Sequence, residues 1–191
     1  MTGAWITYGD PFTEPPVATD PVAGRLADQA ALLGEGPDTD AADTGKPVAV
    51  ADLAAPPHRR AWPVYSAAAL AAGARSVLAV PLRTGTTKIG LLGLYSRRPL
   101  VLVTPQRAEV DAIAEVVIGL LLEDIGTPGQ SPARASQCPE IHQATGIVAA
   151  QLGVGVGEAL ARLRAHAYAS ATPLSEIAHG VVTRLLRIPA E

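Results

Sequence analysis

Apolar side chains repeat at spacings of three and four residues after Thr104, which predicts one amphipathic helix over about residues 104–125. Threonine is a favoured helix N-cap, and Pro105 suits the first helical position. The predicted apolar face consists of Val110, Ile113, Ala114, Val117 and Leu121. We therefore expect a helix of about five turns that buries one face.

Upstream of this helix, the pattern favours strands. Two segments rich in β-branched residues and leucine, 76–82 and 88–96, flank the polar stretch 83–87 and predict a β-hairpin. The other predicted elements are a helical turn at about 38–44, a strand at 46–53 and a helix at 61–72 that ends at Gly73. This order predicts an α+β fold in which helices flank an antiparallel sheet.

A stretch rich in Gly, Pro, Ser and Gln interrupts the periodicity at 126–136 and predicts a linker. Three apolar stripes of helical spacing follow: Ile141, Ala144, Val148 and Leu152; Val156, Leu160, Leu163 and Ala167; and Leu174, Ile177, Ala178, Val181 and Leu185. Thr172 and Pro173 predict the start of the third helix. Because short helices cannot bury their stripes alone, we expect an all-α three-helix module. The predicted domains are thus 1–125 and 137–191.

The composition is that of an ordinary globular protein of 191 residues, 48% hydrophobic and 17% charged, with a net charge of −3. No apolar run reaches about 18 residues, and no signal-peptide pattern is visible, which predicts a cytoplasmic protein. The single cysteine, Cys138, cannot form an internal disulfide, which agrees with that location. The four histidines lie in no catalytic or metal-ligand motif, so we expect no enzyme, no metal site and no cofactor.

The arginines of the last module suggest a binding role. Arg162 and Arg164 lie on the predicted second helix with Tyr168, and Arg184 lies on the predicted third helix. Arginine pairs with phosphate, and tyrosine stacks on unpaired bases, which suits RNA. The alternative is that these charges only solubilise the helices, because five arginines face four glutamates from residue 132 onward. Charge alone leaves both interpretations open.

Three motifs in order strengthen the first interpretation: QATGIV at 143–148, EALARLRAHA at 158–167 and PLSEIA at 173–178. Residues 137–188 thereby resemble the ANTAR family of RNA-binding antiterminators. Most of residues 14–125 resembles a GAF sensor domain of the kind that precedes ANTAR modules in actinobacterial regulators. The segments that carry this second resemblance are 34–37, 44–48, 62–63, 73–82 and 89–96.

The ANTAR resemblance implies a non-catalytic protein that binds paired hairpin loops in nascent RNA and prevents a terminator hairpin from forming. The expected RNA contacts are Ala144, Thr145, Gly146, Arg164, Ala167 and Tyr168, with Arg162 and Arg184 as flanking charges. In this interpretation Arg164 contacts phosphate or guanine, and Tyr168 stacks on a base. The competing interpretation is a ligand-sensing or protein-interaction module whose helical tail no longer binds RNA.

Two hairpins imply two copies of the chain, so we predict a homodimer. The helix over residues 106–125 is the candidate for pairing, because its apolar spacing is like that of a coiled coil. The alternative is that its apolar stripe packs only on its own sheet.

The GAF resemblance implies a small-molecule ligand. Trp62, Tyr65 and Tyr95 either line a pocket for it or are plain core residues. Cyclic nucleotides are not expected, because the family motif for them uses Asn and Phe, whereas this chain has no Asn and its one Phe is Phe12. Family members usually have another helix and strand upstream, so we expect this chain to start inside the sensor domain.

Overall fold

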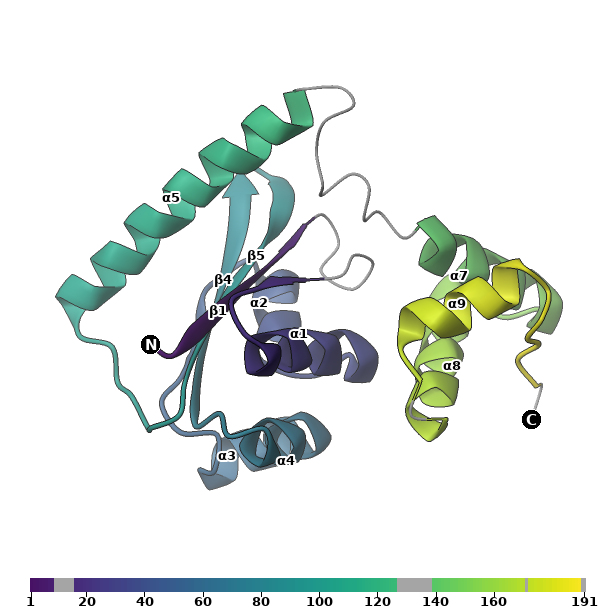
Figure 1. Cartoon of the computed structure of the whole chain (residues 1–191), viewed down its shortest axis with the longest axis horizontal. Helices are drawn as coiled ribbons and strands as arrows, with labels where there is room; N and C mark the ends of the chain where they lie inside the picture. Colours follow the sequence, from purple (N-terminus) through teal and green to yellow (C-terminus); the bar gives the residue numbers. More distant parts are fainter. Residues whose placement is uncertain (9–15, 127–138, 171, 190–191) are drawn as a thin grey trace. The chain divides into compact units, whose positions relative to one another are not determined.

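The computed structural model describes residues 1–8, 16–126, 139–170 and 172–189 (Figure 1). The chain divides into two compact units, Met1–Ser136 and Gln137–Glu191, called here the sheet unit and the helical unit. From residue 127 on, the expected linker at 126–136 lies outside the described residues.

The sheet unit contains a five-stranded antiparallel sheet with the strand order β2–β1–β5–β4–β3. The strands are β1 (Gly3–Tyr8), β2 (Val17–Ala18), β3 (Val48–Val50), β4 (Ser76–Thr84) and β5 (Thr87–Ser96). Strands β4 and β5 form the predicted hairpin but pair further than expected, so that only Gly85 and Thr86 remain in the loop. Gly85 has a φ of 59°, the left-handed conformation that two-residue hairpin loops favour.

Strand β1 packs closely on β5 at Gly93. Trp5 is the register partner of Gly93, and its indole ring covers the glycine so closely that a Cβ atom there would overlap the ring. Trp5 is only 1% exposed. A glycine is therefore required at this position of β5 to make room for the tryptophan.

Helices cover both faces of the sheet (Figure 1). Those that precede the hairpin are α1 (Pro21–Leu33), α2 (Pro37–Thr44), α3 (Pro56–Ala61) and α4 (Pro63–Ala71). Helices α1 and α4 enclose one core with Trp5, while α5 (Thr104–Gly126) packs on the side chains of Leu78, Val80 and Leu92. Because both faces are covered, β4 carries buried residues in succession rather than at alternate positions.

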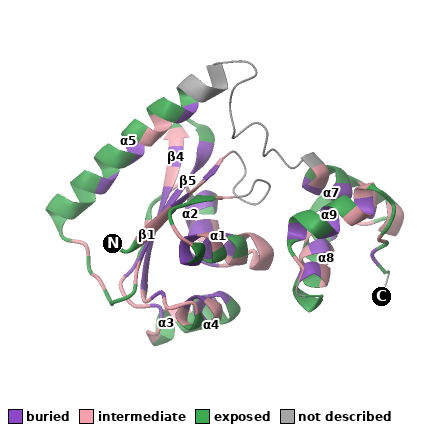
Figure 2. Ribbon diagram, viewed as in Figure 1, coloured by how far each residue is buried: buried purple, intermediate pink, exposed green. Residues whose placement is uncertain are grey.

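The predicted apolar face of α5 is only partly buried. Val110, Ala114 and Leu121 pack against the sheet, whereas Ile113 is 51% exposed. Figure 2 shows that much of the helix surface is accessible. The helix over 104–125 is therefore confirmed, but its apolar residues form two faces rather than one.

The α+β prediction is confirmed, with several differences in detail. The single helix predicted at 61–72 is wrong, because α3 and α4 are separated at Trp62, whose φ of −132° and ψ of 73° are not helical. The residue before a proline is disfavoured in the helical region, and Pro63 follows directly. Strands β1 and β2 and helix α1 were not among the predicted elements.

The helical unit consists of α7 (Pro139–Leu152), α8 (Val156–Ala169) and α9 (Leu174–Val182), which confirms the three-helix prediction. Its core contains Ile141, Ala144, Val148, Ala159, Leu163, Ala167, Leu174, Ile177, Ala178, Val181 and Ile188. Two residues of the predicted stripes, Val156 and Leu185, are instead 68% and 85% exposed. Leu185 is exposed because it lies beyond the end of α9.

Both ends of α9 differ from the prediction. The helix begins at Leu174. The Thr172 hydroxyl does not cap this helix but donates to the Ser170 carbonyl oxygen at 3.2 Å. The helix ends at Val182, so Arg184 lies beyond it rather than on it, as does Arg187. The two arginines therefore belong to the segment that follows the helix.

Within the described ranges, no single helix has both the length and the apolar character needed to cross a membrane. Helices α7 and α8 pass that test only when taken together, across a bend of 106°.

Candidate functional site

The exposed side of α8 carries Arg164 and Tyr168. The two residues are four positions apart and therefore neighbours on the helix surface. Tyr168 is 58% exposed, whereas Arg164 is half-buried with its Nε atom covered. A guanidinium beside an exposed phenol ring can pair with a phosphate while the ring stacks on a base.

Three of the expected contact residues lie in the core of the helical unit instead. Ala144 and Ala167 are completely buried, and Thr145 is 4% exposed. The Thr145 hydroxyl donates to the carbonyl oxygen of Ile141 at 2.6 Å, within α7. These small residues let the helices pack closely, and because they are buried their side chains are not part of the exposed surface.

Gly146 is the exposed member of the small-residue motif on α7. A Cβ atom at this position would meet no other atom within 4 Å. The structure of the chain itself therefore gives no packing reason for glycine here. A backbone without a side chain does permit close approach of a ligand from outside.

Arg162 lies on a different flank of α8. At 100° per residue it is roughly 200° around the helix axis from Arg164. Its Nη2 atom donates to Glu158 Oε1 at 2.9 Å in an exposed pair with i, i+4 spacing. Because this pair neutralises it and it faces another way, Arg162 does not share a surface with Tyr168.

Arg184 terminates α9 in an unusual backbone conformation. Its φ is 60°, and it is the one non-glycine residue with positive φ among those described. Its amide donates to Val181 O at 3.1 Å, and the amide of Leu185 donates to Gly180 O at 2.8 Å, the pattern of a Schellman C-cap. Glycine usually occupies this position because a side chain costs about 1 kcal/mol there.

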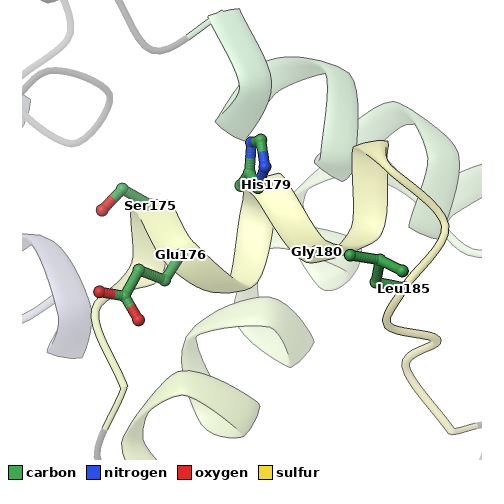
Figure 3. A pocket seen from close by; sticks show the side chains of 5 residues that line it. All are labelled: Ser175, Glu176, His179, Gly180 and Leu185. Atoms are coloured by element: carbon green, nitrogen blue, oxygen red, sulfur yellow. The ribbon is translucent and has the colours of Figure 1, made fainter.

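A groove of about 450 Å³ runs along α9 (Figure 3). Ser175 and Glu176 line its start, and Leu185 lies at its far end. The nearby His179 Nδ1 is 3.0 Å from Glu140 Oε1, which links α9 to α7. Because the Glu176 carboxylate lines it, the groove is not suited to phosphate.

In the sheet unit, Trp62, Tyr65 and Tyr95 all belong to one buried core cluster. Trp62 stacks on His58 with ring centroids 5.7 Å apart, and the Tyr95 hydroxyl donates to Asp20 Oδ1 at 3.1 Å. The Tyr65 hydroxyl is buried and has no hydrogen-bond partner in the described part of the chain. The three aromatic residues are thus brought together, and of their polar atoms only the Tyr65 hydroxyl is both fully buried and without a hydrogen-bond partner in the described ranges.

Asp38, at the start of α2, is a buried carboxyl that the sequence did not reveal. It is 2% exposed, and its Oδ2 accepts a hydrogen bond from Trp5 Nε1 at 2.8 Å. Burial raises the pKa of Asp38 to about 7, although the bond from Trp5 opposes this shift. Acidic residues are common in the first turn of exposed helices, so no sequence signal distinguishes this one.

Two interacting residues, Asp38 and Tyr65, each have a buried polar atom without a hydrogen-bond partner in the described ranges, Asp38 Oδ1 and Tyr65 Oη. Burial, and next the charge of Asp38, raise the pKa of Tyr65 well above its usual value. Buried polar groups are normally hydrogen-bonded, so these two atoms are unusual for a protein interior. Among the described residues, no cluster of three His, Cys, Asp or Glu side chains is arranged to hold a metal ion.

Comparison with protein families gives two matches along the chain. A family model described as GAF domain matches residues 1–118, and one described as ANTAR domain matches residues 132–182. A search of curated proteins finds no match. The boundary between the two family matches lies near the boundary between the two compact units.

Two solved structures show weaker similarity. A mutated NreA protein from Staphylococcus aureus, described as mutated in its nitrate binding site, is 22% identical, with coverage of 53% of this chain and 78% of that chain and a TM-score of 0.34. An RNA-binding Light-Oxygen-Voltage receptor is 17% identical, with coverage of 95% of this chain and 46% of that chain and a TM-score of 0.25. Both TM-scores are too low to support an argument about this chain.

Proposed function

Because the chain belongs to the GAF domain family and carries an ANTAR domain after its GAF domain, we propose that it is a sensor-controlled antitermination regulator that binds paired hairpin loops in nascent RNA. GAF and ANTAR domains are typically sensory and RNA-binding rather than catalytic. The observation that carries the proposal is the placement of Arg164 beside the exposed ring of Tyr168 on α8. This activity belongs in the cytoplasm, where transcripts are made.

The RNA-contacting surface consists of Gly146, Arg164 and Tyr168. Tyr168 stacks on an unpaired loop base, and Arg164 pairs with phosphate or with a guanine edge. Gly146 on α7 lets the RNA backbone come close. Arg184 adds a positive charge at the end of α9, where its costly backbone conformation supports a role outside folding. Arg162 contributes less, since Glu158 already pairs with it.

Two copies of the chain pair through the outer face of α5. Ile113, Val116 and Leu120 are 51%, 63% and 61% exposed, and their spacing of three and four residues matches the a and d positions of a coiled coil. A second copy suits this stripe because the same stripe is then buried on both chains. Leu120→Glu should give monomers in sedimentation, whereas Val101→Glu, at a residue 73% exposed outside the helix, should not. A dimeric Leu120→Glu protein contradicts this pairing.

The sensed small molecule binds around Asp38 and Tyr65. The support is that Asp38 Oδ1 and Tyr65 Oη are both buried without a hydrogen-bond partner in the described ranges, whereas no such atom belongs to Trp62 or Tyr95. Tyr65→Phe removes an unsatisfied hydroxyl, so the unfolding temperature should stay equal or rise. A large fall in that temperature would show that the hydroxyl is needed for folding and would count against a ligand role.

The direct test is a titration of the full chain with labelled RNA that carries two adjacent hairpins. A one-hairpin RNA and a duplex DNA serve as controls at the same salt concentration, because salt alone changes such affinities strongly. The proposal predicts at least about tenfold tighter binding to the two-hairpin RNA, as expected when two linked sites act together. Equal affinity for all three would contradict the proposal and favour a module whose helical tail no longer binds RNA.

A further inference from the structure

The charges of the sheet unit are unevenly distributed along its sequence. From Leu53 to Ala108 the chain has no Asp or Glu, although the whole protein has 18 of them. Eight cationic residues lie in this segment: Arg59, Arg60, Arg75, Arg83, Lys88, Arg97, Arg98 and Arg107. The net charge of −3 for the whole chain therefore conceals a strongly positive region.

Strands β4 and β5 place three of these arginines at one end of the sheet. Arg75 directly precedes β4, while Arg97 and Arg98 directly follow β5. The Arg75 amide donates to the Ser96 carbonyl oxygen at 2.8 Å, and the Ser76 hydroxyl donates to the Arg98 carbonyl oxygen at 3.2 Å. The hairpin itself therefore holds the three arginines close together.

Helix α3 adds Arg59 and Arg60 at the same end. Asp52 pairs with Arg75 at 2.8 Å and begins the turn into α3, where the Ala55 amide donates to its carbonyl oxygen at 3.1 Å. Arg75, and to a smaller extent His58, lowers the pKa of Asp52, so α3 lies within electrostatic reach of the pair. In Figure 1, α3 and the segment that leads from β5 to α5 lie at the same end of the sheet.

Arg107 completes this group from the first turns of α5. It lines a groove of about 150 Å³ together with Ser76 and Leu100. We call the six residues the arginine edge: Arg59, Arg60, Arg75, Arg97, Arg98 and Arg107. All except the half-buried Arg75 are exposed, and of these six residues only Arg75 forms an ion pair within the described part of the chain. The edge ends at the acidic residues Glu109 and Asp111 of α5.

We propose that the arginine edge of the sheet unit is a second RNA-binding surface that contacts the phosphate backbone flanking the hairpins. This inference rests on the proposed function for the identity of the ligand. The edge is made of arginines, which bind phosphate bidentately, while both lysines of the chain lie elsewhere. The helical unit has no positive excess, since its four arginines face four glutamates, so a linked cationic surface would raise overall affinity.

The test compares the salt dependence of RNA binding in matched variants of the full chain. The edge variant Arg59→Gln/Arg60→Gln/Arg98→Gln removes three exposed charges. The control Arg25→Gln/Lys46→Gln/Lys88→Gln removes three exposed charges elsewhere on the same unit. Each lost phosphate contact reduces the slope of log K against log salt by about 0.7 to 0.9, so the edge variant should lose about 2 from its slope. Its affinity at about 0.1 M salt should fall roughly 10- to 100-fold, and the control should change little.

A charge-preserving variant separates electrostatics from folding. Arg59→Lys/Arg60→Lys/Arg98→Lys should retain most of the slope, and the preference for two hairpins over one should persist in every variant. The inference is overturned if the edge variant keeps the wild-type slope, if the control loses as much, or if the lysine variant loses as much as the glutamine variant. These outcomes differ from failure of the proposed function, in which the wild-type chain itself shows no preference for the two-hairpin RNA.

Discussion

The two units of this chain differ in where their unusual chemistry lies. In the sheet unit, apart from the arginine edge, it is inside: Asp38 is a buried carboxyl held by Trp5, and Asp38 Oδ1 and the Tyr65 hydroxyl lack partners in the described ranges. In the helical unit it is outside: the core is built from small and aliphatic residues, while Arg164 and Tyr168 lie towards the surface. A buried carboxyl that lowers stability suits a sensor domain. An exposed tyrosine and a nearby arginine over an aliphatic core suit a binding module.

The stability of the sheet unit should be the more sensitive to substitution, because the Trp5 ring packs very closely against Gly93 in its core. Gly93→Ala places a methyl group against the buried indole of Trp5, so we expect a loss of about 3 kcal/mol or more in stability. Both tryptophans lie in this unit, so tryptophan fluorescence during urea unfolding reports on it alone. The control Gly119→Ala, on an open part of α5, should stabilise by up to about 1 kcal/mol. Wild-type stability in Gly93→Ala would show that the contact relaxes easily.

Asp38 should make the sheet unit pH-dependent. Its pKa is about 7 in the folded state and near 3.8 when unfolded, so the folded state retains a proton that the unfolded state releases between these values. Stability is therefore highest at low pH within this window and falls by up to about 1.4 kcal/mol per unit as the pH rises towards 7.

Asp38→Asn should remove that dependence, because an amide does not ionise while its oxygen can still accept from Trp5. The measurement is the urea midpoint, followed by tryptophan fluorescence, at pH 5 and pH 8 in both proteins. The urea midpoint of the variant, relative to that of the wild type, should be higher at pH 8 than at pH 5. Asp28, whose pKa burial also raises, is present in both proteins and cancels in the comparison. Equal pH dependence in the two proteins would contradict this role of Asp38.

In the helical unit, Arg184→Gly should raise stability and lower RNA affinity together. Glycine removes the cost of a positive φ, a gain of about 1 kcal/mol, and also removes a positive charge. Slower hydrogen exchange of the Leu185 and Leu186 amides, which both bond to Gly180, would report the gain. Arg184→Ala serves as the control, because it should lower RNA affinity without slowing exchange. Unchanged RNA affinity in both variants would show that Arg184 acts only in the C-cap of α9 and does not contribute to RNA binding.

The smallest effect is expected at Arg162. Its exposed pair with Glu158 should contribute about 0.3 to 0.5 kcal/mol, so Arg162→Ala should barely change the unfolding temperature. RNA affinity should change by less than about threefold, since this side chain faces away from Tyr168. A larger fall in affinity, measured by the same RNA titration, would place Arg162 on the binding surface.

The elements that could be predicted from the sequence are those that depend on a local pattern of residues. Spacing identified α5, the β4–β5 hairpin and the three helices of the helical unit, and short motifs identified the two families. Strand β1 was missed because its partner β5 lies more than eighty residues away, and pairing of this kind leaves no local period. Asp38 was missed for the same reason, since only the folded chain brings Trp5 to it.

The structure separates the predicted RNA contacts into buried and exposed residues. Small motif residues resemble one another in sequence, yet Ala144 and Ala167 are buried while Gly146 is exposed. The break at Trp62 and the positive φ of Arg184 depend on backbone conformations that residue type alone does not specify. Which positions carried the family motif could thus be read from sequence, but which of them face a ligand could not.

The central claim, that α8 of the helical unit binds RNA through the exposed ring of Tyr168, is tested most directly by one titration. The affinity of the full chain for the two-hairpin RNA is measured for the wild type, Tyr168→Phe and Tyr168→Ala at fixed salt. Stacking on a base contributes about 1 to 3 kcal/mol, so Tyr168→Ala should bind roughly 5- to 150-fold more weakly, while Tyr168→Phe keeps the ring and most of the affinity. Equal affinity of all three proteins would contradict the account.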